Sequence, residues 1–393
     1  MDCTALALAM NQQSLRARVH GAGPTGVLAA LALAQAGWRV QLLDPLTPEA
    51  LRQRSRAYAL THSSRVLLER LDLWQPLLPH LAPFRRLELC DQATHLQVPF
   101  TLEDLGPRGD HPSAQAVGWI LQHPPLMALL LDRAAVEPAI ALALGAPLPQ
   151  AAPVDLVVAA DGSGSPTRRS AGLHWLARPY RQGCLTVQVR LRGSAVDQAW
   201  ELFRPEGPFA VLPLGGDAFQ LVWSAPAEKL RRLEALEPVA FLEALSAALP
   251  AALQPEVLLD QPRAYPVGLE LAWPLRRGSL VLVGEAAHRC HPVGGQGLNL
   301  CWRDVAVLHT LAGRAAAGRL RPSRLPAAYA WRRWPDLLLI LLATDAMVRL
   351  FSNRNVLLLP ARRLALTLLG RLPWLRRLSL AAMTDGPAGS LRA

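Results

Sequence analysis

The fold is decided by one short stretch near the N-terminus, Gly21-Ala22-Gly23-Pro24-Thr25-Gly26. Residues 15–20 before it alternate apolar and polar side chains, as a β-strand does, and the Ala-rich residues 27–36 after it predict a helix. Residues 38–43 predict a second strand that closes on Asp44. Glycines in a G-x-G-x-x-G pattern permit a tight turn and let the backbone approach a pyrophosphate at the helix N-terminus. We therefore expect a β-α-β dinucleotide-binding unit, with Asp44 where an acid binds a ribose hydroxyl.

The predicted first strand departs from the usual pattern of such a unit. Central strands of parallel sheets are buried on both faces and are mostly apolar along their length. Here Arg16, Arg18 and His20 interrupt the apolar residues of the strand. A dinucleotide-binding fold does not by itself explain these three side chains.

Two further motifs follow apolar stretches. Residues 154–160 predict a strand that runs into A-D-G-x-x-S-x-x-R, which places Asp161, Gly162 and Arg168 at one strand tip. Standing alone, that motif would indicate a surface turn after a core strand. Residues 280–283 predict another strand, followed by Glu285, which can reach ribose or ribityl hydroxyls, and by a Gly-rich turn at 292–297. This turn opens a helix, so its N–H groups and dipole face any negative charge there.

The charge of the chain is concentrated at its C-terminal end. The net charge is +11, and residues 314–393 carry all of it, with 14 Arg against three acidic side chains. Because this segment is also rich in Leu, it suits an anionic membrane surface better than DNA. The alternative is an ordinary basic surface with no membrane contact. Arg is the predominant basic residue throughout the chain and Lys229 is its only lysine, so the arginines of this segment do not by themselves indicate a membrane. We expect no nucleic-acid partner.

Cysteine usage and hydropathy limit the cellular setting. The five cysteines are scattered, odd in number and without C-x-x-C spacing, which favours a reduced, cytoplasmic protein. The longest apolar run, residues 337–343, is far shorter than the roughly 20 residues that a membrane span needs. Peripheral contact with the inner face of a membrane is therefore the further expectation. His288, Cys290 and His291 lie close in sequence, but no second ligand cluster accompanies them, so we expect no metal.

Together the three motifs resemble those of class A FAD-dependent aromatic monooxygenases, which have the para-hydroxybenzoate hydroxylase-like fold. Further stretches look like one branch, the ubiquinone-biosynthesis hydroxylases. They are Arg56-Ala57-Tyr58-Ala59-Leu60, residues 291–300 (HPVGGQGLNL), Arg303-Asp304-Val305, Thr344-Asp345, Leu350-Phe351-Ser352-Asn353, Arg362 and Leu364. The resemblance runs from about residue 15 to residue 383. Three features depart from the family: Glu285 replaces Asp, Cys301 replaces Gly, and residues 137–153 are shorter than the usual β-meander.

The resemblance implies an α/β fold, in which a Rossmann-like FAD-binding domain carries an inserted antiparallel-sheet substrate domain and is followed by a C-terminal helical segment. The expected boundaries are 14–74, 115–180 and 263–325 for the FAD-binding domain, 75–114 and 181–262 for the substrate domain, and 326–393 for the basic helices. Within the insertion, residues 184–191 alternate as a strand, residues 209–214 and 218–223 predict a hairpin, and residues 263–269 predict a returning strand. Residues 228–249 predict one or two helices, and the C-terminal helices are expected to break near Pro335, Pro360 and Pro373.

The resemblance also implies the chemistry. NAD(P)H, the co-substrate, reduces FAD, dioxygen forms a flavin C4a-hydroperoxide, and a hydroxyl passes to an electron-rich ring, so no catalytic side chain is expected. The implied substrate is a prenylated phenol of ubiquinone- or plastoquinone-type biosynthesis. Candidate substrate contacts are Trp200, Phe203, Phe209, Trp223 and Tyr265. The implied cofactor-binding residues are Gly21, Gly23, Pro24, Gly26, Asp44, Arg56, Asp161, Gly162, Arg168, Gly284, Glu285, Pro292, Gly294, Gly295, Gln296, Gly297, Leu298 and Asn299.

Two alternatives remain open at this point. One is another flavin enzyme of the same fold, such as a hydroxylase of small soluble aromatic compounds, a halogenase or a prenyl reductase. The Arg- and Leu-rich tail argues against a small soluble substrate, and no W-x-W-x-I-P segment of tryptophan halogenases is present. The other is a catalytically degenerate, flavoprotein-like subunit that helps to assemble a membrane-associated quinone-biosynthesis complex. The short stretch at 137–153 and the polar first strand motivate it.

Overall fold

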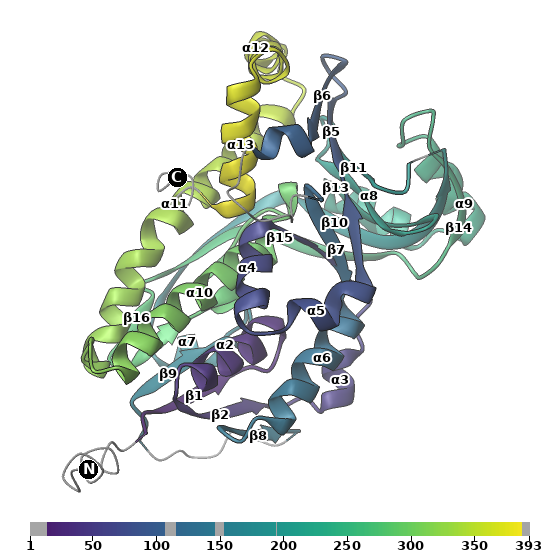
Figure 1. The fold of residues 1–393 in the computed structure, drawn as a ribbon. Coiled ribbons are helices and arrows are strands. Elements are labelled where there is room, and N and C mark those ends of the chain that lie inside the picture. Colours follow the sequence, from purple (N-terminus) through teal and green to yellow (C-terminus); the bar gives the residue numbers. More distant parts are fainter. Residues whose placement is uncertain (1–13, 107–114, 146–152, 194, 387–393) are drawn as a thin grey trace, which may run out of the picture.

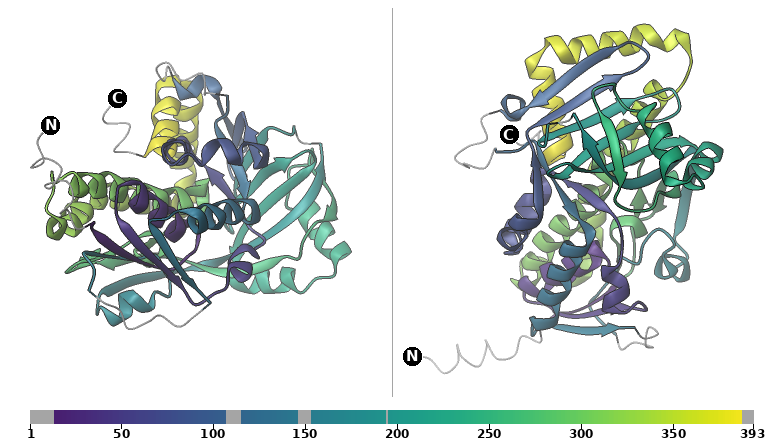
Figure 2. Two further views of the ribbon diagram at one scale, coloured as in Figure 1. Left: turned by 60° about the horizontal axis from the view of Figure 1, so that its bottom comes forward. Right: turned by 90° about the vertical axis from the view of Figure 1, so that its right-hand side faces the viewer.

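The computed structural model describes residues 14–106, 115–145, 153–193 and 195–386. A parallel sheet with its helices forms one end of the molecule, and a larger, mostly antiparallel sheet forms the other (Figure 1). The C-terminal helices run along the side of both parts, and the last ones lie beside the larger sheet (Figure 2). This architecture confirms the predicted fold class.

The parallel sheet is built around the predicted β-α-β unit. Its strands, in spatial order, are β16 (Arg276–Arg277), β17 (Leu280–Leu282), β9 (Leu156–Ala159), β1 (Arg16–His20), β2 (Arg39–Asp44) and β8 (Ile140–Leu144). All neighbours are parallel except the β16–β17 pair. Helices α2 (Pro24–Gln35), α6 (His123–Val136) and α10 (Gln296–Ala316) share one apolar core with one face of the sheet.

The alternation of β1 explains its polar residues. Ala17 and Val19 are fully buried in the core under the helices. Side chains of successive strand residues point to opposite faces, so Arg18 points away from this core, where its Nε donates to Gln41 Oε1 at 3.2 Å. The polar residues therefore occupy the second face of a normal central strand. Of the short stretch at 137–153, residues 146–152 lie outside the described part of the chain.

The larger sheet holds the predicted insertion. Its strands, in spatial order, are β18 (His288–Arg289), β15 (Arg263–Trp273), β10 (His174–Arg192), β13 (Ala218–Pro226), β12 (Phe209–Gly215), β11 (Gln198–Phe203), β5 (Arg86–Asp91) and β6 (Leu96–Thr101), and β14 (Gln254–Leu258) pairs with β10. Neighbouring strands are antiparallel except β11 and β5. The hairpin of β12 and β13 and the returning strand β15 confirm the sequence predictions. Two helices, α8 (Ala227–Glu234) and α9 (Pro238–Ser246), occupy the stretch expected to be helical.

Shorter elements connect the two large sheets. A third sheet has the order β3 (Ala57–Leu60), β7 (Gly118–Gln122) and β4 (Leu81–Phe84). The short helices are α3 (Pro48–Arg52), α4 (His62–Arg70), α5 (Trp74–Leu77), η1 (Leu78–His80), η2 (Leu102–Leu105), α7 (Pro166–Ser170), η3 (Gly284–Ala286), η4 (Val293–Gly295), η5 (Pro322–Arg324) and η6 (Val356–Leu358).

The C-terminal segment contains α11 (Leu325–Phe351), α12 (Leu359–Arg371) and α13 (Pro373–Asp385). Pro360 and Pro373 lie in the first turns of α12 and α13, where proline is tolerated. The predicted break at Pro335 is wrong, because α11 runs through this residue. Proline inside a helix costs about 3 kcal/mol, but Tyr329 and Leu337 bury the helix on both sides of Pro335.

Candidate functional site

A cavity of about 520 Å³ lies between the three sheets. Its volume falls within the range of roughly 300–1,000 Å³ that is typical of ligand pockets. Fourteen of the eighteen predicted cofactor-binding residues line it: Gly21, Gly23, Pro24, Asp44, Arg56, Asp161, Gly162, Glu285, Pro292, Gly294, Gly295, Gln296, Gly297 and Leu298. The other four, Gly26, Arg168, Gly284 and Asn299, do not form part of the cavity wall as described. The structure thus brings the three sequence motifs to one place.

The first glycine turn leaves open space beside its backbone. A Cβ atom on Gly21, whose φ is +95°, would lie 2.4 Å from the Ala160 carbonyl oxygen, and one on Gly26 would lie 1.8 Å from the Gly21 oxygen. A Cβ on Gly23 would meet no atom within 4 Å, and this residue faces the cavity. Gly21 and Gly26 therefore permit close packing, whereas Gly23 leaves room for a ligand.

The polar groups around this turn leave the N-terminus of α2 free for an anion. No side chain caps this helix, and its first turn contains no acidic residue. The buried Asp44 carboxylate accepts hydrogen bonds from the Ala22 N–H at 2.7 Å and the Leu46 N–H at 2.8 Å. These bonds fix Asp44 at the cavity edge, and its side chain holds the turn in shape. Exposed N–H groups and the helix dipole favour phosphate at such a position.

The second motif mainly forms hydrogen bonds within itself and to the third motif. Asp161 accepts hydrogen bonds from the Ser165 hydroxyl and from the Thr167 N–H at 3.0 Å. The buried Arg168 donates to the carbonyl oxygens of Ala286 at 2.8 Å and Ser163 at 2.7 Å. Arg168 thereby ties the second motif to the third, away from the cavity, while Asp161 and Gly162 line it.

The third motif places a second uncapped helix N-terminus at the same cavity. Gly294 and Gly295 have φ values of +68° and +63°, which only glycine adopts without strain, and they lead into α10. As in α2, no side chain caps α10 and no acid lies in its first turn. The Asn299 side chain locks the turn to β3 by donating to the Ala59 oxygen at 2.7 Å and the Gly295 oxygen at 2.8 Å.

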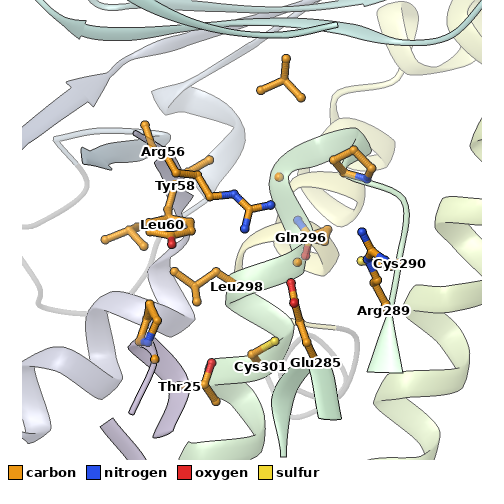
Figure 3. A pocket seen from close by; sticks show the side chains of 18 of the residues that line it. Thr25, Arg56, Tyr58, Leu60, Glu285, Arg289, Cys290, Gln296, Leu298 and Cys301 are labelled. Carbon is orange, nitrogen blue, oxygen red and sulfur yellow. The ribbon is translucent and has the colours of Figure 1, made fainter. Parts of the chain in front are cut away.

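Charged side chains from two sides point into this part of the cavity. Figure 3 shows the guanidinium of Arg56, the residue just before β3, and the Glu285 carboxylate, from η3, directed toward the same space. Arg56 lies over the rings of Tyr265 and Tyr58, at 5.6 and 6.0 Å from the ring centres. Burial opposes the charge of Arg56, but Tyr265, Tyr58 and Glu285 raise its pKa above the usual value. Arg56 therefore presents a permanent positive charge to a ligand.

A buried ionic network behind the third motif was not predicted as a unit. The Asp304 carboxylate accepts from the Gly284 N–H and His288 Nε2, both at 2.7 Å, and from Arg333 Nε at 2.5 Å. Burial disfavours its ionised form, but His288 and Arg333 outweigh burial and lower the pKa of Asp304. Through this carboxylate, α11 holds in place the segment that presents Glu285.

The network continues to the Gly-rich turn. Arg333 also pairs with Asp336 at 2.6 Å, and Asp336 pairs with Arg303 at 3.3 Å. Arg303 in turn donates to Gln296 Oε1 at 3.1 Å. The partners lie in α10 and α11, about 30 residues apart in sequence, so no local pattern could have revealed the network.

The larger sheet forms the ceiling of the cavity. Its contribution is mostly apolar and comprises Leu87, Thr186, Ala199, Glu201, Ala210, Leu212, Val222, Tyr265, Val267, His288 and Arg289. Of the five aromatic residues considered as substrate contacts, Tyr265 alone lines the cavity; the other four do not. Trp200, Phe209 and Trp223 pack in the core on the other side of the sheet, and Phe203 packs in a neighbouring core. Sequence reasoning missed Glu201, which shares an alternating strand with Trp200.

These features suit a dinucleotide with a ring system. Two uncapped helix N-termini, one open glycine turn and the Arg56 and Glu285 side chains surround a cavity whose ceiling is mostly apolar. A flavin dinucleotide offers a pyrophosphate, hydroxyls and an anionic reduced ring to these groups. Within the described residues, no group of three or more His, Cys, Asp or Glu side chains could hold a metal ion.

Comparisons with known proteins agree with this fit. Residues 150–334 match the model of a family described as "FAD binding domain". The chain is 32% identical to the ubiquinone hydroxylase UbiL of Rhodospirillum rubrum, over 92% of this chain and 87% of that protein. It is 28% identical to the 3-demethoxyubiquinol 3-hydroxylase of Escherichia coli, over 90% of this chain and 96% of that protein.

A solved structure shows the same fold. The p-nitrophenol 4-monooxygenase PnpA of Pseudomonas putida DLL-E4 superposes with a TM-score of 0.78, covering 95% of this chain and 99% of that chain. The two sequences are only 18% identical, so the likeness concerns the fold alone.

Proposed function

Because the chain belongs to the FAD-dependent aromatic-ring monooxygenases, in the ubiquinone-hydroxylase branch, we propose that it hydroxylates a prenylated phenol in quinone biosynthesis. It is an NAD(P)H-utilising enzyme with FAD as its cofactor. The observation that carries the proposed substrate class is the ceiling of the cavity. Its lining residues on strands β10, β11, β12, β13 and β15 include neither Lys nor Arg to bind the carboxylate of a small aromatic acid, whereas Leu212, Val222 and Val267 suit a ring with an apolar chain. Arg289 of β18 also lines the cavity, but it donates to the Pro266 oxygen at 2.7 Å and lies 3.7 Å from Glu270.

We propose these roles for the residues of the cavity. Gly21, Gly23 and Pro24 at the start of α2 hold the pyrophosphate, and Asp44 holds the adenine-side ribose. Glu285 binds a hydroxyl on the flavin side through a side chain one methylene longer than Asp. Asp161, Gly162 and Arg56 contact the cofactor from the remaining sides.

The flavin ring is proposed to lie against residues 292–298, whose N–H groups stabilise negative charge on it. Bound FAD supplies the redox and oxygen-transfer chemistry. The surrounding residues orient the substrate ring and exclude water from it. Gly26, Arg168, Gly284 and Asn299 support the binding turns from behind, as their packing and hydrogen bonds suggest.

The test of this proposal compares two substrates. A phenol with a short prenyl chain and the same phenol without the chain are incubated with the FAD-loaded enzyme, NADH or NADPH, and air. We expect hydroxylated product from the prenylated phenol and a kcat/KM at least about tenfold lower without the chain, since each buried methylene contributes about 0.8 kcal/mol. Turnover of the short phenol alone would favour the small-substrate alternative, and no product from any phenol would favour the degenerate subunit.

We also propose that the C-terminal helices contact an anionic membrane surface, which would give access to a membrane-dissolved substrate. No described helix is long and apolar enough to cross a bilayer. Leu357, Leu364 and Leu368 repeat at helical spacing and are 81%, 61% and 39% exposed, and Trp374 on α13 is 62% exposed. Exposed arginines flank them at positions 354, 363, 371 and 377. Leu and Trp side chains beside Arg are typical of interfacial helices.

Vesicle sedimentation tests this contact. The chain should bind vesicles that contain phosphatidylglycerol and release them at high salt, because screening weakens charge attraction. The double variant L357S/W374S should lose most of this binding. V239S, at a 70% exposed position on α9, is the matched control and should bind as the unchanged chain does. Equal binding of all three proteins would contradict the proposal.

A further inference from the structure

Among the described residues, one acidic side chain lies in the mostly apolar ceiling of the cavity. Glu201 is on β11, beside Ala210 of β12, and the same row across the sheet continues with Val222 and Thr186. Ala210 has a small side chain, and both residues line the cavity. Glu201 itself is only 8% exposed. A carboxyl group in an apolar wall is costly, and structures keep such groups mainly where they serve a function.

The hydrogen bonding of Glu201 points it to the Gly-rich turn. Its Oε2 accepts from the Gly294 N–H at 3.3 Å, and among the described residues it has no ion-pair partner. Gly294 belongs to the turn that we propose beside the flavin ring. Glu201 therefore lies at the junction of two walls, where a substrate ring under the ceiling would meet the cofactor.

The surroundings of Glu201 bring the pKa of its carboxyl group close to neutral pH. Burial raises the pKa of the Glu201 carboxyl to about 7, although the Gly294 N–H partly opposes this rise. The turn contributes His291, which is neutral because burial lowers its pKa to about 4. The other titratable groups that face this region are Asp91 on β5, Cys184 on β10, Tyr265 on β15, Arg56 just before β3, Tyr58 on β3, Glu285 and Cys290 near η3, and Arg289 on β18.

Most of these groups are held by other partners. Asp91 accepts from the Thr94 hydroxyl at 2.7 Å and lies 4.0 Å from Arg362. Arg56 lies between the rings of Tyr58 and Tyr265. Glu201 is thus the carboxyl group of the ceiling that is available to a ligand.

We propose that Glu201 is a catalytic base that accepts the proton of the substrate's ring hydroxyl. The inference rests on the proposed hydroxylation of a phenol. A phenol has a pKa of about 10, so it is mostly protonated at neutral pH, and its ring is a weaker nucleophile than that of the phenolate. A base works best when its pKa lies near the working pH.

The proposed step balances as follows. The substrate O–H bond breaks and an O–H bond forms on the Glu201 carboxylate. The electron pair left on the phenolate oxygen moves into the ring, and the ring carbon bonds to the outer oxygen of the O–O bond that the enzyme's O₂ and NAD(P)H chemistry supplies. This O–O bond breaks, and its inner oxygen keeps the bonding electron pair. The ring then loses its hydrogen as a proton to that inner oxygen, the aromatic system is restored, and Glu201 returns its proton to the product oxygen.

E201Q tests the proposal, because Gln keeps the size of Glu and an acceptor for the Gly294 N–H but cannot take up a proton. We expect FAD binding and reduction by NAD(P)H to stay normal, while hydroxylation at pH 7 falls by about 100-fold or more. The consumed NAD(P)H should then appear as hydrogen peroxide. In the unchanged enzyme, hydroxylation should rise with pH through about 7, as the Glu201 carboxyl loses its proton. In E201Q this rise should vanish, and hydroxylation should recover only toward the phenol's own pKa of about 10.

Two further variants complete the experiment. E201D keeps a carboxylate and should retain the rise of hydroxylation with pH. E206Q removes a carboxylate from the turn between β11 and β12. Glu206 pairs with Lys229 at 2.8 Å and does not line the cavity, so its variant should behave as the unchanged enzyme. If E201Q kept the pH profile of hydroxylation and formed as much hydroxylated product per NAD(P)H consumed as the unchanged enzyme, the role of Glu201 would be overturned and the hydroxylase function left intact. Failure of the unchanged enzyme to hydroxylate any phenol would instead overturn both.

Discussion

The network around Asp304 allows a prediction whose size follows from the structure. In D304N, the side chain keeps an acceptor for the Gly284 N–H but loses the charge that faces Arg333 at 2.5 Å and His288 at 2.7 Å. Arg333 is 3% exposed in its side chain and cannot regain water. Breaking a buried ion pair from one side costs about 3–5 kcal/mol.

This cost converts into a measurable loss of thermal stability. Unfolding entropy is about 2.1 cal/mol/K per residue, and the chain has 393 residues. The Tm measured by circular dichroism should therefore fall by about 4–6 °C. The Kd for FAD, measured by quenching of flavin fluorescence, should rise by about tenfold, which is the effect of about 1.4 kcal/mol on the segment that presents Glu285.

D132N is the matched control for this prediction. Asp132 also pairs with an arginine, Arg52, at 2.7 Å, but its side chain is 69% exposed. Exposed ion pairs contribute about 0–1 kcal/mol, so this variant should melt within about 1 °C of the unchanged chain. If D304N melted as D132N does and bound FAD equally well, the network would not hold the third motif in place.

Two further predictions concern the turns of the cavity. G23L should fold normally, because a Cβ atom at Gly23 meets no protein atom within 4 Å. It should nevertheless weaken FAD binding by about 100-fold through loss of two backbone bonds to phosphate, each contributing about 1.5 kcal/mol. G313L, in α10, also places its Cβ where no atom lies within 4 Å and should bind FAD normally; equal FAD affinities of G23L and G313L would refute the assignment of Gly23 to the phosphate site. Between pH 6.5 and 4 the free energy of unfolding should fall by about 3 kcal/mol, because burial lowers the pKa of His291 from 6.5 to about 4 and the unfolded chain takes up the proton first. Urea unfolding should show this loss in the unchanged chain and lack it in H291L; a parallel fall in both would contradict it.

Sequence patterns were sufficient to predict how the three motifs meet. Each motif follows a strand of one parallel sheet, and β17, β9 and β1 are neighbours. The carboxyl ends of parallel strands lie at the same edge, which is where ligands bind in such sheets. Local signals of strand, turn and helix therefore determine that Gly21, Asp161 and Glu285 line one cavity.

The ceiling was less accessible to prediction from sequence. Aromatic residues lie in most strands of the insertion, and the choice between its two faces depends on strand register and on which face meets the other domain. Trp200 and Glu201 are adjacent, yet one packs in the core and the other lines the cavity. Likewise, Pro335 lies within α11 because distant residues bury the helix on both sides, and no local pattern reports such contacts.

The most direct test of the proposed function uses oxygen isotopes. The FAD-loaded enzyme is given NADH or NADPH, a prenylated phenol and ¹⁸O₂ in ordinary water, and the product is analysed by mass spectrometry. A monooxygenase acting on this substrate should insert one ¹⁸O atom into the ring, with the prenyl chain unchanged. A product that carries oxygen from water, a product altered only in its prenyl chain, or NAD(P)H consumption that yields hydrogen peroxide and no hydroxylated ring would contradict the proposed function.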